Sequence, residues 1–518
     1  MNGGVAPSTN DALLALRHDL EAADYRVERV DELLGEEATA ALERGNRVPA
    51  RRGILHREPS PLSLLVRLFL LNEPLTTEET TTAFPTLGLA AARELGLLDI
   101  EDGLVHAALD LRPYSFDDGV GAGHWWLLSD LGELARGGAL PEDHVLGVGG
   151  ASMSLSSLMI PERARRVLDL GTGCGIQAMH ASRFADAVVA TDISERAIRL
   201  ARLNLDLNGI EGVELRLGDL FAPVQGETFD RLVSNPPFVI TPRIEGVPSY
   251  EYRDGGLVGD ALVESVVRGT ADILEPGGIA QFLANWEYRD GVDGLERIEA
   301  WLEGSGLEYW IVERERQDAA EYAETWIRDG GTRPGTEEFD RLADAWLEDF
   351  EHRGVDAVGF GYVLVRKPIG QPLLRRAERV VTPLGTTPLG LHLADCLDAH
   401  DRIAGLPDAE LEAVAFTVAP DVTVERHYWP GDEDPTAMIL RQGGGFGRQV
   451  VAGTALTAFV GASDGDLSLG AIAAALGDLL GVDGAAVAAE LVVDARELVL
   501  GGFLLPAGAV RRVDARTS

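Results

Sequence analysis

The feature that most constrains the fold is an alternation of short apolar runs and helical segments within residues 166–240. Strand-like runs include Val167, Val188 and Phe229, and amphipathic helical spacing follows the first two runs. This alternation predicts a βαβαβ unit with a parallel sheet. Ligands of such sheets bind beyond the carboxyl ends of the strands. We therefore expect functional residues in the turns after these runs.

The first of these turns is rich in glycine and reads Gly171-Thr172-Gly173-Cys174-Gly175. Glycine lets the backbone adopt a positive φ and lets a ligand approach the main chain, while the next helix offers free amide groups. The spacing is GxGxG, which differs from the GxGxxG dinucleotide fingerprint. A tight turn without a ligand would use the same residues, so this turn alone leaves both interpretations open.

Acidic residues end the next two runs. Asp192 follows the second run, where a carboxylate can accept both hydroxyls of a ribose, although a helix N-cap would also suit this position. Asp219 ends the third run, where its side chain can reach the edge of an adenine. Together with the glycine turn, these residues predict a site for a nucleoside cofactor.

The fourth run ends in Asn235-Pro236-Pro237-Phe238. Two prolines could simply end a strand, because proline fixes φ and donates no hydrogen bond. The alternative is chemical: the Asn235 side-chain oxygen and the Pro236 carbonyl can accept both N–H hydrogens of a planar nitrogen, which turns its lone pair toward a methyl donor. Pro237 would hold these acceptors rigid, and Phe238 offers a face for stacking.

These motifs together resemble the class I S-adenosylmethionine-dependent N-methyltransferases of the (D/N/S)PP(Y/F/W) group, over about residues 145–367. The group includes glutamine N5-methyltransferases of release factors and ribosomal proteins, ribosomal RNA guanine-N2 and adenine-N6 methyltransferases, and DNA adenine methyltransferases. The resemblance implies a Rossmann-like α/β domain with a seven-stranded sheet, closed by an antiparallel strand at 358–365, and S-adenosylmethionine as cofactor.

The resemblance also implies roles for individual residues. The glycines of the first turn would line the methionine part of the cofactor, Asp192 would bind its ribose, and Asp219 with Leu220 would flank its adenine. The expected cofactor-binding residues are Asp169, Gly171, Thr172, Gly173, Gly175, Asp192, Ile193, Asp219, Leu220 and Asn235. The expected catalytic residues are Asn235, Pro236, Pro237 and Phe238.

Net charge bears on the substrate. The chain carries 84 acidic and 45 basic residues, a formal net charge of −39. Nucleic-acid binding draws much of its affinity from phosphate neutralisation, and the short arginine clusters at 47–52, 163–166 and 375–379 are more typical of solvated surfaces. We therefore prefer a protein glutamine amide, on a release factor or ribosomal protein, as the substrate.

Other readings stay open. Release-factor enzymes usually show NPPY, whereas NPPF is frequent among RNA enzymes, in which a histidine often follows; here Val239 follows. An exocyclic amine of an RNA base is therefore the alternative substrate. DNA adenine-N6 and then a small-molecule amine come after it, and a non-catalytic binding protein that keeps the fold is the remote alternative.

The length of 518 residues predicts several domains. We expect an N-terminal helical, winged-helix-like domain over 1–140, the methyltransferase domain over 145–368, and a C-terminal α+β domain over 369–518 that ends in a winged-helix-like unit. The third helix of the N-terminal domain lacks the basic side chains that a DNA groove demands, which favours protein docking or a structural role.

Two further segments are expected to border the site. Residues 147–157, rich in Gly and Ser, can fold over the methionine end of the cofactor. The loop 240–256 can cover the substrate with Tyr250, Tyr252, Arg253 and Asp254.

Cysteine usage and hydropathy set the expected surroundings. Two widely spaced cysteines predict neither a disulfide framework nor a metal site. No apolar run reaches the roughly 20 residues that cross a bilayer, and the first residues lack a secretory pattern. We expect a cytoplasmic protein with no membrane or metal partner.

Overall fold

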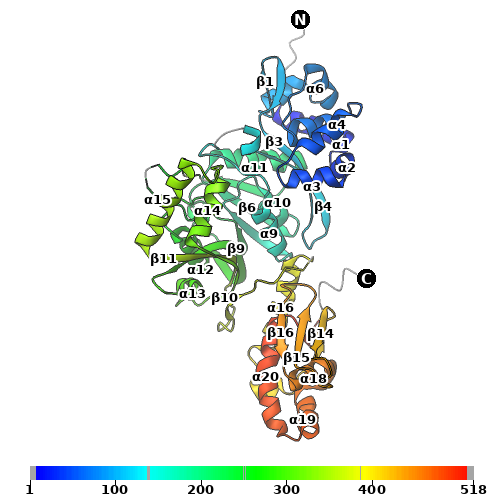
Figure 1. Cartoon of the computed structure of the whole chain (residues 1–518), viewed down its shortest axis with the longest axis vertical. Coiled ribbons are helices and arrows are strands. Elements are labelled where there is room, and N and C mark those ends of the chain that lie inside the picture. The colour runs from blue at the N-terminus through cyan, green and yellow to red at the C-terminus, as the bar shows by residue number, and fades with distance from the viewer. Residues whose placement is uncertain are drawn as a thin grey trace. The chain divides into compact units, whose positions relative to one another are not determined.

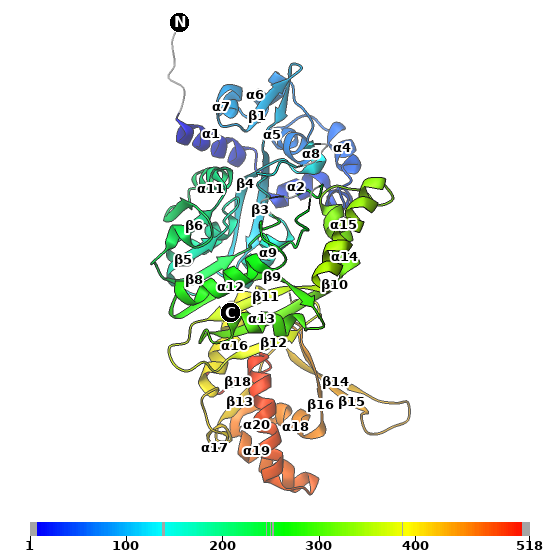
Figure 2. The ribbon, with the colours of Figure 1, turned by 90° about the vertical axis from the view of Figure 1, so that its left-hand side faces the viewer.

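A computed structural model describes residues 8–136, 140–244, 246–248, 250, 253–385 and 387–509. The chain divides into two compact units (Figures 1 and 2). The first unit comprises Met1–Ser156, Arg163–Leu307 and Glu315–Ile369, and the second comprises Ser157–Glu162, Glu308–Arg314 and Gly370–Ser518. Within the described residues, no helix combines the length and the apolar character needed to cross a bilayer.

The predicted βαβαβ unit lies at the centre of the first unit. Its parallel strands are β5 (Ala164–Leu170), β6 (Ala185–Asp192), β7 (Val213–Leu217) and β8 (Phe229–Ser234), linked by the helices α10 (Ile176–Ala181) and α11 (Glu195–Asn208) and the short 3₁₀ helix η2 (Ala222–Val224). Leu168, Val189 and Leu232 are almost completely buried. Central parallel strands are covered on both faces, so they need apolar side chains along their whole length.

The sheet continues on the other side of β8. β9 (Leu274–Arg289) pairs with β8 in parallel, and β11 (Val355–Arg366) pairs with β9 antiparallel, which gives the order β11-β9-β8-β5-β6-β7. The helices α12 (Ala261–Ile273) and α13 (Gly294–Leu302) accompany these strands. The large mixed sheet with its helices confirms the Rossmann-like α/β fold and the antiparallel closing strand. The count of seven strands stays a prediction, because β10 (Glu308–Asp318) begins within the second unit.

The N-terminal segment is helical and ends in two hairpins. Its elements are α1 (Thr9–Ala22), α2 (Val27–Leu34), α3 (Glu36–Glu43), α4 (Val48–Leu55), α5 (Pro61–Leu65), η1 (Val66–Leu70), α6 (Thr77–Ala83), α7 (Gly88–Glu94), β1 (Leu98–Glu101), β2 (Leu104–Ala107), β3 (Asp110–Asp117), β4 (Ala122–Ser129) and α8 (Glu133–Arg136). The expected order of helices followed by a hairpin around Asp102 and Gly103 is present. Its assignment as a winged-helix-like domain stays a prediction.

Two asparagines of α11 attach β4 to the parallel α/β core. The Asn204 amide accepts a hydrogen bond from the Leu128 N–H (2.7 Å) and donates one to the Leu128 carbonyl (2.9 Å). Asn208 makes the same pair of bonds with Trp126, at 3.0 and 2.8 Å. The side chains thus take the place of a neighbouring strand. The Trp126 indole N–H also bonds the Tyr25 carbonyl, at 2.6 Å, as a buried indole usually requires.

A helical insertion borders the loop after Asn235-Pro236-Pro237-Phe238. It consists of α14 (Ala319–Asp329) and α15 (Glu337–Arg353), which lie side by side (Figure 2). Their apolar faces form one core with Val239 and Ile240. The Ile240 N–H donates to the Tyr322 hydroxyl at 3.0 Å. The insertion therefore fixes the path of the chain directly beyond the predicted catalytic residues.

The second unit has its own apolar core, centred on Phe416, Phe459 and Leu491. Its elements are α9 in part (Gly150–Leu158), β10 in part, β12 (Arg375–Arg379), α16 (Leu389–Ile403), α17 (Asp408–Leu411), β13 (Ala415–Val418), β14 (Val422–His427), β15 (Ala437–Gln442), β16 (Gln449–Ala452), α18 (Thr454–Ala462), β17 (Asp464–Ser468), α19 (Leu469–Leu480), α20 (Gly484–Leu500) and β18 (Leu504–Pro506). The glycine run 443–447 joins β15 to β16, as the expected hairpin turn.

The last described strand has a partner far away in the sequence. β18 pairs antiparallel with β13, about ninety positions earlier in the chain, through contacts such as Phe416 with Pro506. The helices α19 and α20 precede β18. The assignment of this part as a second winged-helix-like unit stays a prediction.

We predict that Asn204→Leu will destabilise the first unit by roughly 2–5 kcal/mol. The substitution keeps the bulk of the side chain but leaves the N–H and carbonyl of buried Leu128 without partners, together with the Cys174 carbonyl that Asn204 also bonds at 2.8 Å. Chemical denaturation of the variant measures the loss. Arg202→Ala, at an exposed position of the same helix, is the control and should change stability little. Equal stabilities of the two variants would contradict the role of Asn204.

Candidate active site

The glycine turn after β5 holds three left-handed residues: Gly171 (φ +75°), Gly173 (φ +56°) and Gly175 (φ +91°). Among the described residues, a Cβ added to Gly171 or Gly173 would meet no atom within 4 Å, whereas one added to Gly175 would lie 3.1 Å from the Ala201 Cβ of α11. Gly175 thus permits close packing of two helices. Gly171 and Gly173 leave the main chain open on the other side.

Asp169 lies beneath this turn. One carboxylate oxygen accepts hydrogen bonds from the Thr172 hydroxyl (2.6 Å) and the Ala178 N–H (2.9 Å), and the residue is fully buried. Burial raises the pKa of Asp169 to about 7. The carboxylate thus supports the turn from below, at the N-terminal part of α10.

Asp192 connects the turns that follow β5 and β6. Its two oxygens accept from the Gly173 N–H and the Ser194 N–H, both at 2.9 Å, and burial raises the pKa of the carboxyl. The N-cap of α11 is Ser194, whose hydroxyl accepts from the Ala197 N–H. The alternative reading of Asp192 as this cap is therefore wrong, and its carboxylate remains at the ends of two adjacent strands.

A cavity of about 420 Å³ opens at this edge of the sheet. Most of the predicted cofactor-binding residues line it: Gly171, Thr172, Gly173, Asp192, Ile193, Asp219, Leu220 and Asn235. Asp169 and Gly175 do not belong to this lining. Asp169 supports the glycine turn from beneath, and Gly175 packs against α11. Ile193 is 63% exposed, which leaves an apolar side chain at the rim of the cavity.

Other residues of the lining were not predicted individually from the sequence. His144, Leu146, Gly147 and Ser152 close one side, and Gln177, Tyr250, Leu262 and Val266 contribute elsewhere. The Gly and Ser content of 147–157 was the signal for Gly147 and Ser152, whereas His144 and Leu146 precede that segment and were missed. His144 is held there because the next residue, Val145, exchanges hydrogen bonds with Asp130 at 2.8 and 3.1 Å.

The corner formed by Asn235, Pro236 and Pro237 follows the last parallel strand. The Ser234 hydroxyl donates to the Leu170 carbonyl at 2.6 Å, which ties the end of β8 to that of β5. The Asn235 Oδ1 is buried and has no hydrogen-bond partner among the described residues. An unpaired buried acceptor costs about 1–3 kcal/mol, so this atom calls for a partner from outside the chain.

A second cavity, of about 760 Å³, meets the first at this corner. Both are lined by His144, Leu146, Ser152, Asn235, Pro236 and Pro237. Phe238 lines the larger cavity, with its ring 6.5 Å from that of Trp326 and 5.5 Å from that of Phe360. The predicted catalytic residues thus stand where the two cavities share their walls.

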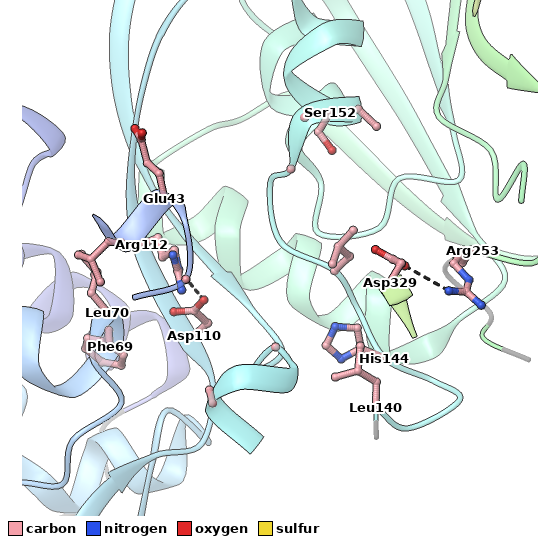
Figure 3. Close-up of a pocket in the computed structure, with 18 of the residues that line it drawn as sticks. Glu43, Phe69, Leu70, Asp110, Arg112, Leu140, His144, Ser152, Arg253 and Asp329 are labelled. Atoms are coloured by element: carbon pink, nitrogen blue, oxygen red, sulfur yellow. Dashed lines mark hydrogen bonds and ion pairs between the residues drawn. The ribbon is translucent and has the colours of Figure 1, made fainter. Parts of the chain in front are cut away.

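The wall of the larger cavity comes from three parts of the chain. Figure 3 shows Glu43, Phe69 and Leu70 of the N-terminal segment on one side, and Leu140, His144 and Arg253 on the other. Its charges are balanced: among the described residues, the lining holds four carboxylates (Asp31, Glu43, Asp110, Asp329) and three guanidinium groups (Arg47, Arg112, Arg253). The ion pairs Arg112–Asp110 and Arg253–Asp329 are drawn in Figure 3.

The loop expected to cover the substrate divides between the two cavities. Tyr250 lines the smaller one and Arg253 the larger one. Asp254 is buried and accepts from the Thr241 hydroxyl (2.7 Å) and the Tyr250 N–H (2.6 Å), so it shapes the loop from inside. Tyr252 lies outside the described residues.

Metal ligation was not expected. In the part of the chain that the structure describes, no group of three or more His, Cys, Asp or Glu side chains is placed to hold a metal ion.

We predict a pH-dependent stability difference between Asp169→Asn and the parent protein. The folded pKa of Asp169, about 7, lies above its ordinary value of 3.8, so the folded state binds this proton more tightly than the unfolded chain. The stability from this group is complete below about pH 4 and lost as the pH rises through 7. The asparagine variant should therefore gain relative stability, by roughly 2–3 kcal/mol, between pH 5 and pH 8.

Denaturation at a series of pH values measures this difference. Asp186→Asn, at an exposed position of β6, is the control, and its difference from the parent should stay nearly constant. A flat profile for Asp169→Asn would contradict the effect of burial on this carboxyl.

Two family models match the chain. Residues 22–108 match a domain of unknown function (DUF7059), and residues 148–289 match the methyltransferase small domain. The second match covers the glycine turn, Asp192, Asp219 and the corner at Asn235.

Similar curated proteins fall into two kinds. Ribosomal protein uL3 glutamine methyltransferase of Bradyrhizobium diazoefficiens is 35% identical over 151 residues, which cover 27% of this chain and 46% of the relative. Release factor glutamine methyltransferase of Moorella thermoacetica is 35% identical over 146 residues, 26% of this chain and 52% of the relative. Ribosomal RNA small subunit methyltransferase C of Erwinia tasmaniensis is 29% identical over 188 residues, 35% of this chain and 48% of the relative.

The chain thus spans about half the length of the curated relatives that it matches. Within that span, the order of the motifs agrees with the match of residues 148–289 to the methyltransferase small domain.

Proposed function

We propose that the protein transfers the methyl group of S-adenosylmethionine to a planar nitrogen of a macromolecule, and that the preferred target is a glutamine side-chain amide of a protein. The observation that carries the proposal is the shared corner of the two cavities. Asn235, Pro236 and Pro237 line both, and the buried Asn235 Oδ1 has no partner among the described residues. A cofactor in the smaller cavity and a substrate in the larger one would meet there.

The smaller cavity suits a sulfonium nucleoside. Gly171 and Gly173 leave the main chain open, the Asp192 carboxylate faces the position expected for a ribose, and Ile193 offers an apolar rim for a flat base. Among the described residues, the charged side chains of its lining are acidic apart from His144: Glu142, Asp192 and Asp219. Such a field favours a cation. When bound, S-adenosylmethionine would supply an electrophilic methyl group.

The residues of the chain then orient the acceptor nitrogen. The Asn235 Oδ1 and the Pro236 carbonyl accept its two N–H hydrogens, and Pro237 limits the freedom of this turn. The nitrogen lone pair is thereby directed toward the smaller cavity. Alignment of the reacting atoms supplies much of the rate enhancement, and no strong base is required because the nitrogen can lose its proton after the transfer.

The composition of the larger cavity supports a protein substrate. Its guanidinium groups are matched by carboxylates, whereas binding of a phosphate backbone draws on excess positive charge. Much of its wall is apolar, with Val30, Leu34, Leu42 and Leu70 from the N-terminal segment. Two of the relatives are named as methyltransferases of glutamine in ribosomal protein uL3 and in a release factor.

An RNA base amine is the second candidate. The observation that favours it is Phe238 in place of tyrosine, together with the similarity to ribosomal RNA small subunit methyltransferase C. Of the predicted domains, the one at 1–140 would supply one wall of the substrate cavity, and the one at 145–368 would supply the chemistry. The predicted domain at 369–518 has no assigned role in this proposal.

We predict that Asn235→Ala will reduce turnover by roughly a hundredfold or more. The substitution removes one of two acceptors for the target nitrogen, a loss comparable to that of one transition-state hydrogen bond. Affinity for S-adenosylmethionine, measured by calorimetry, should remain nearly unchanged. Turnover is measured as transfer of labelled methyl to protein of a cell lysate. Persistent turnover in this variant would remove Asn235 from the mechanism.

We predict the opposite pattern for Asp192→Ala. The variant loses a ribose acceptor and the bond to the Gly173 N–H, so affinity for S-adenosylmethionine should fall by roughly tenfold to a hundredfold. Calorimetry measures this loss, and Asp186→Ala on the same strand is the control. An unchanged affinity would exclude Asp192 from the cofactor site.

The substrate class is tested by digestion of the labelled product. Lysate is incubated with the protein and radiolabelled S-adenosylmethionine, then treated with protease or with nuclease. Release of label by protease alone supports the glutamine assignment. Label that survives protease and is released by nuclease would replace it with the RNA alternative, and an absence of transfer would contradict methyl transfer itself.

A further inference from the structure

Trp326 of the helical insertion faces the larger cavity beside Phe238. The two rings meet edge to face, with centroids 6.5 Å apart and an angle of 74°. The indole Nε1 is buried and has no hydrogen-bond partner among the described residues. Trp326 therefore brings to the lining of the cavity a residue whose N–H donor is buried at a cost in free energy unless a partner arrives.

The indole is held in this position by its neighbours. Arg253 is 5% exposed and donates to the Trp326 carbonyl at 3.0 Å and to the Asp329 carboxylate at 3.2 Å. Its guanidinium lies over the rings of Trp326 and Tyr250, at 5.7 and 4.8 Å from their centroids. Tyr322 packs on the same ring at 6.0 Å. With these contacts, the ring cannot turn to find a partner inside the protein without breaking its packing.

Arg253 also connects this ring to the predicted catalytic loop. Its carbonyl accepts from the N–H of Val239, the residue after Phe238, at 2.9 Å. Trp326, Asn235 and Pro236 thus line the same cavity, and Arg253 contacts both Trp326 and the loop that follows Pro236.

The hydrogen-bonding groups of a peptide explain why the cavity has both a donor and acceptors. Asn235 Oδ1 and the Pro236 carbonyl only accept, so they serve the N–H₂ end of a planar amide. A peptide segment that brings this amide also brings carbonyl oxygens, which lose their water on entering the cavity and need donors in return. Two guanidinium groups of the lining are engaged: that of Arg253 bonds Asp254, Asp329 and the Trp326 carbonyl, and that of Arg112 bonds Asp110.

We propose that Trp326 determines specificity by donating its indole N–H to a carbonyl oxygen of the protein segment that carries the target amide. With Phe238, the same ring forms an apolar wall for that segment. This inference rests on the proposed function and makes it more specific, because it assigns a peptide carbonyl to the site.

The test is Trp326→Phe, which keeps an aromatic ring and removes the N–H. Labelled methyl transfer is measured at increasing concentrations of lysate protein with saturating S-adenosylmethionine. We expect the half-saturating concentration of protein to rise about fivefold to tenfold, the value of one hydrogen bond, while the plateau rate stays within about twofold. Affinity for S-adenosylmethionine, measured by calorimetry, should not change.

Trp346→Phe is the matched control. Trp346 belongs to the same apolar core as Trp326 but is outside the described lining of the larger cavity. Its substitution should leave the half-saturating concentration unchanged once thermal unfolding shows that both variants are folded at the assay temperature. This control separates loss of a substrate contact from a general loosening of the insertion.

The outcomes separate this inference from the proposed function. Transfer that depends on Asn235 but saturates equally in Trp326→Phe and the parent protein would overturn the role of Trp326 alone. A fall in plateau rate and cofactor affinity without a change in half-saturation would assign Trp326 a structural role, which also overturns it. Label found in nucleic acid would overturn the peptide carbonyl, and no transfer by the parent protein would overturn the proposed function.

Discussion

Hydrogen bonds from main-chain amides to one buried and one half-buried carboxylate hold the turns on which the site depends. Asp169 accepts from the Ala178 N–H under the glycine turn, and Asp192 accepts from the Gly173 N–H within it. Burial raises the pKa of both carboxyls. These bonds offset part of the free energy that burial of the carboxylates costs. They also fix a glycine-rich backbone that has few side chains of its own to pack. The open main chain at Gly171 and Gly173 is a consequence of this support.

The larger cavity depends on a different kind of anchoring. Asn204 and Asn208 bond the edge of β4 and so attach the N-terminal segment to the sheet, while Arg253 joins the loop after Phe238 to α14. The lining of the smaller cavity thus comes mainly from the parallel sheet and its turns, and much of the lining of the larger cavity comes from additions to the sheet. The match to the methyltransferase small domain covers most of the first lining and omits most of the second.

Sequence patterns predicted most of the residues that line the smaller cavity, for a physical reason. The carboxyl ends of neighbouring parallel strands lie at one edge, so motifs separated by twenty residues come together without knowledge of the rest of the fold. Gly173, Asp192 and Asn235 were found in this way. The family resemblance added Asp169, whose carboxylate lies beneath the turn, because the strand direction at one residue decides which layer a side chain enters.

The sequence by itself determined the parallel α/β core and the corner at Asn235, because hydrophobic period and turn chemistry are local properties. The antiparallel closing strand was predicted from the family resemblance. Only the tertiary structure decided that His144, Trp326 and the N-terminal segment surround that corner, since these residues meet through packing between segments up to three hundred positions apart. It likewise decided that β18 pairs with β13. Strand partners and cavity walls depend on long-range burial, which no local pattern records.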